Sequence, residues 1–112
     1  MAEAELTPQQ IIDQIPVAFR AEKAQDLEAT FQFDITGSLG GQWYAEIKDS
    51  RCQVTAGSSP SANITITISD QNFVKLITGR LDGTMAFMTG KLKLKGDMGL
   101  AMRLSGLFQM PD

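Results

Sequence analysis

The middle of the chain, from residue 31 to residue 68, alternates apolar and polar residues with a period of two, and this constrains the fold more than any other feature. The alternation recurs in four segments separated by short turns, at residues 31–35, 43–47, 52–56 and 64–68. Because successive side chains of a strand point to opposite faces, each segment predicts a half-buried strand. Four consecutive strands joined by short turns predict an antiparallel meander with one apolar face and one wet face.

Helical signals come before the first strand. Thr7 is a good N-cap, Pro8 suits the first helical position, and Gln10 completes a capping box with Thr7. Pro16 must either kink this helix or start a second one, because proline has no backbone N–H to donate. Residues 21–26 predict a further polar helical turn.

Helical and strand patterns also alternate after the fourth strand. They predict helices at 70–79 and 82–90, a strand at 91–95 and a last helix at 98–108. Asp70 is the predicted N-cap of the first of these helices. The order of elements predicts one α+β domain over residues 1–112, a five-stranded, mostly antiparallel sheet with one face covered by helices.

Composition excludes several function classes. The net charge of −3 among 112 residues argues against a nucleic-acid partner, which requires a basic surface. The chain has no histidine and one cysteine, Cys52, so Cys–His and Ser–His pairs and Cys/His zinc sites are excluded, and neither a metal nor a cofactor is expected. The remaining catalytic candidates are Cys52, Asp34, Glu46 and Asp49. Asp34 and Glu46 fall on outward strand positions and Cys52 on an inward one, so the sequence predicts no enzyme and no catalytic residue.

The chain also gives signals about its location. No run approaches the roughly 18 apolar residues of a membrane span, and the first five residues, MAEAE, are too acidic for a signal peptide. A lone cysteine fits a reducing compartment. We therefore expect a cytoplasmic protein without a transmembrane segment.

The last helix carries more apolar surface than a sheet-covering helix needs. Either it is wedged into the core, or one face packs on protein while another lines a ligand cavity. Met85, Met88, Met98 and Met102 cluster in this part of the chain. Methionine fills gaps in ordinary cores, but it also suits surfaces that accept varied apolar shapes. Together, the two features favour an apolar pocket.

Residues 87–104, FMTGKLKLKGDMGLAMRL, closely resemble the signature of the sterol carrier protein 2 domain. Residues 64–70 and the Trp43 strand ending at Asp49 resemble it too, and the match runs from about Ile11 to Phe108. The resemblance implies a five-stranded sheet covered by helices with a hydrophobic tunnel between the layers. It also implies binding of a fatty acid, a fatty acyl-CoA, a sterol-like molecule or a phospholipid.

The resemblance also implies which residues form the tunnel wall. Carried over position by position, they are Trp43, Ile66, Phe73, Ile77, Phe87, Leu94, Met98 and Met102. Met85 and Met88 from the methionine cluster complete the predicted ligand-binding set. Near residues 83–85 the chain lacks the glutamine that is common in the family, and it does not end in Ser-Lys-Leu. These departures, with the acidic composition, indicate a bacterial or archaeal stand-alone member.

Lys91, Lys93 and Lys95 alternate with two leucines and therefore share one strand face. They predict either the solvated face of a lysine-guarded edge strand or an anchor for anionic head groups of a membrane or of acyl-CoA. The sequence thus predicts a carrier of a long-chain lipid or acyl-CoA with transient anionic membrane contact. The alternative is a structural domain that dimerises through an apolar patch.

Overall fold

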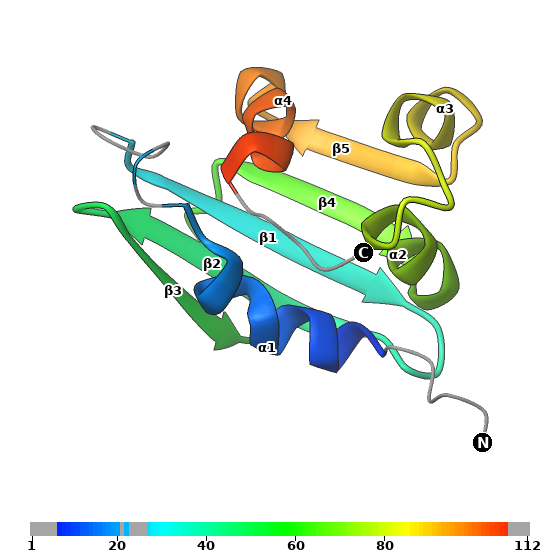
Figure 1. The fold of residues 1–112 in the computed structure, drawn as a ribbon, viewed down its shortest axis with the longest axis horizontal. Helices are drawn as coiled ribbons and strands as arrows, with labels where there is room; N and C mark the ends of the chain where they lie inside the picture. Colours follow the sequence, from blue (N-terminus) through cyan, green and yellow to red (C-terminus); the bar gives the residue numbers. More distant parts are fainter. Residues whose placement is uncertain (1–6, 21, 23–26, 108–112) are drawn as a thin grey trace.

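The computed structural model describes residues 7–20, 22 and 27–107, and among them not the side chains of residues 17, 18, 102 and 104–107. The elements follow the predicted order, helix, four strands, two helices, strand, helix (Figure 1). They are α1 (Pro8–Ala18), β1 (Ala29–Thr36), β2 (Gly41–Lys48), β3 (Arg51–Ala56), β4 (Ile64–Ser69), α2 (Asp70–Ile77), α3 (Gly83–Met88), β5 (Leu92–Gly96) and α4 (Met98–Leu107). Apart from Glu22, the turn predicted at 21–26 lies outside the described residues.

The five strands form one sheet in the order β3-β2-β1-β4-β5. Three neighbouring pairs are antiparallel, as predicted, but β1 and β4 run parallel, with Phe33 opposite Ile66. The predicted four-strand meander is therefore wrong at its last step. Pairing β4 with β1 places the isoleucines of β4 beside the phenylalanines of β1 in the middle of the apolar face, where both are buried.

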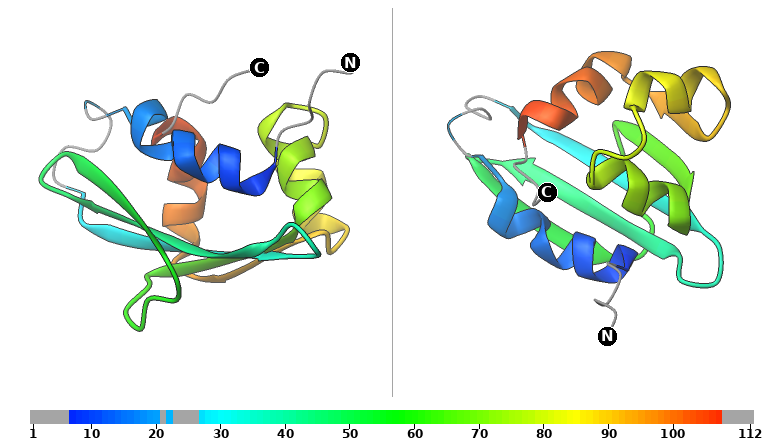
Figure 2. Two further views of the ribbon diagram at one scale, coloured as in Figure 1. Left: turned by 90° about the horizontal axis from the view of Figure 1, so that it is seen from below. Right: turned by 45° about the vertical axis from the view of Figure 1, so that its right-hand side comes forward.

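The connection from β3 to β4 crosses the outer face of the sheet, opposite the helices (Figure 2). The amide side chain of Gln32 on β1 holds it there. Gln32 donates to the carbonyl of Gly57 at 3.2 Å and accepts from the N–H of Ser59 at 2.8 Å. Gln32 is consequently the one buried polar residue of the described chain. Because the crossover uses the outer face, the inner face stays free for the helices.

All four helices lie on the inner side or beside the β5 edge of the sheet (Figures 1 and 2). Helix α1 begins with the predicted capping box between Thr7 and Gln10 and continues through Pro16 to Ala18, so no second helix starts at the proline. Helix α2 is capped by Ser69, whose hydroxyl accepts from the N–H of Asn72 at 3.2 Å.

The predicted cap, Asp70, is instead the first residue of α2. One of its carboxylate oxygens accepts from the N–H of Leu39 in the β1–β2 turn at 3.1 Å. This hydrogen bond ties the start of α2 to the turn of the β1–β2 hairpin. Serine and aspartate are about equally good caps, so the local sequence could not decide between the two neighbours.

Candidate functional site

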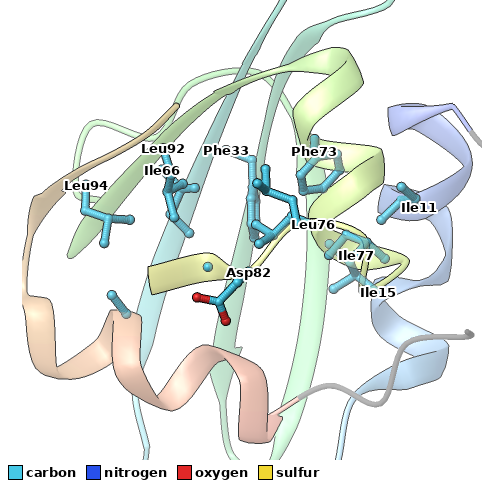
Figure 3. Close-up of a pocket in the computed structure, with 14 residues that line it drawn as sticks. Ile11, Ile15, Phe33, Ile66, Phe73, Leu76, Ile77, Asp82, Leu92 and Leu94 are labelled. Carbon is cyan, nitrogen blue, oxygen red and sulfur yellow. The ribbon is translucent and has the colours of Figure 1, made fainter. Parts of the chain in front are cut away.

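An apolar pocket of about 620 Å³ lies between the sheet and the helices, partly open to solvent (Figure 3). Its volume falls within the range of about 300–1,000 Å³ that is common for small-molecule sites. Its described lining comes from three strands, from the loop between α2 and α3 and from all four helices, with α3 contributing only its first residue, Gly83. The residues are Ile11, Ile15, Phe33, Ile66, Phe73, Leu76, Ile77, Gly79, Leu81, Asp82, Gly83, Leu92, Leu94 and Ala101.

The floor of the pocket is formed by the inner face of the sheet. Phe33 and Ile66 are opposite each other in the parallel pair, and Leu94 is opposite Ile66 in the antiparallel pair. The ring of Phe33 meets that of Phe73 from α2, with centroids 6.4 Å apart and planes tilted by 54°. This aromatic contact joins the floor to the wall at a favourable distance.

The walls come from segments far apart in the sequence. Ile11 and Ile15 of α1 lie one helical turn apart and therefore share a face. The segment after α2, residues 79–83, completes the wall, and Gly79 turns the chain there with φ of 81°. Ala101 of α4 contributes a small side chain, which leaves room in the pocket rather than filling it.

Among the described lining residues, Asp82 is the only one with a polar side chain, and Figure 3 draws its carboxylate as the single oxygen-bearing side chain. Asp82 is exposed at the rim and caps α3, with Oδ2 accepting from the N–H of Met85 at 3.0 Å. The described lining contains no lysine or arginine. The pocket can therefore enclose an apolar chain, but none of the described lining side chains offers a positive charge to an anionic head group.

The structure brings four of the ten predicted ligand-binding residues together in the pocket, namely Ile66, Phe73, Ile77 and Leu94. Trp43 lies elsewhere. It is buried in the core beside Gly41, where its ring fills the space that a side chain on that glycine would need. Met102 belongs to α4, but its side chain is outside the described part.

Met85, Phe87, Met88 and Met98 do not line the pocket. Their exposed fractions are 55%, 46%, 73% and 44%. Helix α3 has only six residues, and its buried residue is the small Ala86, so its large side chains face outward. The family resemblance assigned Phe87 and Met98 to the tunnel wall, and the methionine cluster added Met85 and Met88. The fold presents all four side chains to solvent.

Sequence reasoning missed eight lining side chains besides the glycines. They are Ile11, Ile15, Phe33, Leu76, Leu81, Asp82, Leu92 and Ala101. Most of them were assigned to the inward face of a helix or strand, but periodicity alone does not separate a core position from a pocket wall. Asp82 gave only the signal of a helix cap.

Lys91, Lys93 and Lys95 are all exposed, and none forms an ion pair within the described residues. Lys93 and Lys95 are opposite Thr67 and Thr65 on the outer face of the sheet, away from the pocket. Strand β5 is an edge strand, as the lysine pattern suggested.

The catalytic candidates of the sequence lie away from the pocket lining. Burial raises the pKa of the half-buried Cys52 thiol to about 11, so the reactive thiolate is rare at neutral pH. Glu46 and Asp49 are exposed, and Asp34 accepts hydrogen bonds from the side chains of Gln32 and Gln42 at 3.1 and 3.2 Å.

The chain is similar to known proteins over nearly its whole length. A family described as the SCP-2 sterol transfer family matches residues 9–109. Hydroxysteroid dehydrogenase-like protein 2 of Xenopus tropicalis is 38% identical over 84 residues, which cover 74% of this chain and 20% of the relative. The chain thus spans about a fifth of the length of that relative.

Two solved structures resemble the fold. Sterol carrier protein 2 of Yarrowia lipolytica in its apo form has a TM-score of 0.69 and 29% identity, covering 88% of this chain and 86% of that one. The palmitated SCP2L2 of Aedes aegypti has a TM-score of 0.71 and 27% identity, covering 90% and 93%. Within the described residues, none of the helices has the length and hydropathy needed to cross a membrane.

Proposed function

Because the chain belongs to the SCP-2 sterol transfer family, we propose that it is a carrier that holds one long-chain lipid or acyl group in the pocket between its sheet and helices. The observation that carries the proposal is the pocket itself, about 620 Å³ and apolar except at Asp82 on its rim. Burying a lipid chain against such a surface lowers its free energy, because its apolar surface leaves water. The palmitated relative from Aedes aegypti supports the same ligand class.

The direct test is a titration with a fluorescent long-chain acyl probe. We expect saturation at one probe per chain with a dissociation constant below about 100 µM, where even weak specific binding is measurable. The emission of the probe is the appropriate signal, because Trp43 is buried outside the pocket lining. A signal that rises linearly without saturation would contradict the carrier function.

The proposal assigns no catalysis to this chain. Among the described lining residues Asp82 is the single ionisable one, and neither Cys52 nor the candidate acids Asp34, Glu46 and Asp49 belong to that lining. Hydroxysteroid dehydrogenase-like relatives are about five times longer than the matched segment, so the carrier domain accounts for only part of them. In this proposal, the domain binds and delivers a lipid on which other proteins act.

We further propose that the carrier meets anionic membranes with one edge of the molecule. This α3–β5 edge comprises the exposed side chains Met85, Phe87, Met88 and Met98 and the lysines Lys91, Lys93 and Lys95. Figure 1 shows α3, β5 and the start of α4 following one another along it. Exposed apolar side chains on the same edge as lysines that form no ion pair within the described residues suit a surface of anionic head groups over acyl chains.

The α3–β5 edge also adjoins the pocket. Leu92 and Leu94 of β5 line the pocket with one face, while the neighbouring lysines point to the other. Asp82 and Gly83, at the start of α3, belong to the pocket rim. A carrier docked by this edge therefore holds its pocket close to the bilayer from which a lipid enters.

Replacing Lys91, Lys93 and Lys95 by glutamine should slow transfer of a fluorescent acyl lipid to anionic vesicles by about tenfold or more at low salt. Each surface lysine contributes about 1 kcal/mol of attraction to such membranes. Transfer to neutral vesicles should stay nearly unchanged, and the salt dependence of the anionic rate should flatten. Stopped-flow fluorescence between donor and acceptor vesicles measures these rates.

The matched control replaces three exposed cations outside this edge, Lys48, Arg51 and Lys75, by glutamine. The two triple variants have the same net charge. If the α3–β5 edge is the docking surface, only the variant at Lys91, Lys93 and Lys95 should transfer lipid slowly to anionic vesicles. Equal slowing in both variants would mean that the overall charge of the protein, not this edge, sets the transfer rate. Unchanged anionic transfer together with concentration-dependent self-association would favour the alternative, a domain that dimerises through its apolar patch.

A further inference from the structure

Asp82 places one negative charge at the mouth of a pocket that is otherwise apolar. Its Oδ2 caps α3, while Oδ1 has no hydrogen-bond partner within the described residues. The remaining described lining residues are apolar side chains and glycines. A head group located at the rim therefore meets an anionic acceptor without a compensating lysine or arginine in the lining.

We infer that this pocket selects long-chain ligands whose head group is uncharged and donates a hydrogen bond, such as a hydroxyl, over ligands that end in a carboxylate. The inference rests on the carrier function proposed above and specifies its ligand class. A hydroxyl can donate to the free Oδ1, and hydrogen bonds to charged acceptors are stronger than neutral ones. A ligand carboxylate has no proton to donate and is repelled by the same charge.

The exposure of Asp82 limits the size of the effect. Solvent screens the repulsion at the rim, so two like charges about 4 Å apart are expected to cost about fivefold in affinity, and about tenfold at about 3 Å. The selectivity is therefore expected to be moderate and visible in a ratio of dissociation constants.

The experiment compares three twelve-carbon probes at pH 8, where the acid is ionised, namely dodecan-1-ol, dodecanoate and methyl dodecanoate. They are measured by competition against a fluorescent acyl probe. In Asp82→Asn we expect dodecanoate to bind about five to ten times more tightly than in the wild type. Methyl dodecanoate, which is uncharged and donates nothing, should change by less than about twofold. Asparagine caps helices as well as aspartate does, so α3 should persist, and a thermal melt checks this.

The matched control is Asp49→Asn, which makes the same charge change at the β2–β3 turn, outside the pocket lining. Its backbone has φ of 54°, a conformation that asparagine tolerates well. An equal gain for dodecanoate in both variants, or none in Asp82→Asn, would overturn the inference. Failure of all three probes to bind the wild type would instead overturn the carrier function, so the two failures are distinguishable.

Discussion

Replacing Ile77 by glutamate is expected to weaken binding of a long-chain probe by about 100-fold or more while the domain stays folded. Ile77 ends α2, lines the pocket and is only partly buried. A carboxylate there can remain hydrated in the empty pocket, but a bound acyl chain would strip its water, which costs several kcal/mol. Each factor of ten in affinity corresponds to about 1.4 kcal/mol. Competition titration with dodecan-1-ol measures the loss without charge repulsion on the probe.

Met88→Glu is the matched control for this prediction. Both residues were predicted from the sequence to bind the ligand, yet Met88 is 73% exposed and outside the pocket lining. Its substitution should leave solution binding within about twofold of the wild type, because an exposed carboxylate keeps its water. Equal losses in both variants, or a cooperative melt lost in Ile77→Glu alone, would contradict the assignment of the pocket wall.

Replacing Gly96 by alanine is expected to lower the free energy of unfolding by about 3 kcal/mol or more. Gly96 ends β5 with φ of 121°, a conformation that other residues rarely adopt. A Cβ there would also collide with the backbone oxygen of Asn63 and lie 2.9 Å from the Cα of Ile64. Backbone strain and overpacking each cost about 1–3 kcal/mol. Urea unfolding followed by circular dichroism measures the change.

Gly90→Ala separates the two causes. Gly90 has φ of 80°, but nothing lies within 4 Å of a Cβ built there. Its substitution should therefore show the backbone cost alone, about 1–2 kcal/mol. If Gly96→Ala were no more destabilising than Gly90→Ala, the predicted collision of the new Cβ with Asn63 and Ile64 would add nothing to the loss of stability.

Sequence reasoning predicted the secondary structure well because its strongest signals are local. The period-two alternation around Phe33 and Ile66 identified the strands, and Thr7 and Gln10 identified the start of α1 through a capping box that the structure contains. It predicted the candidate site less completely. Phe87 was assigned to the cavity from the family resemblance, and Met85 and Met88 from the methionine cluster. The six residues of α3 are too short a pattern to define which face that helix buries.

The amino-acid sequence by itself determined the order of the elements, the inward faces of the strands and the apolar surplus that favours a pocket, because these follow from side-chain chemistry at fixed spacing. Only the tertiary structure decided that β4 pairs in parallel with β1, that α3 presents its methionines outward, and that Asp82 reaches the pocket rim. These features depend on which distant segments meet. No local pattern contains two of these contacts. They are the hydrogen bonds from Gln32 to the β3–β4 crossover and the close approach of Gly96 to the backbone of Asn63.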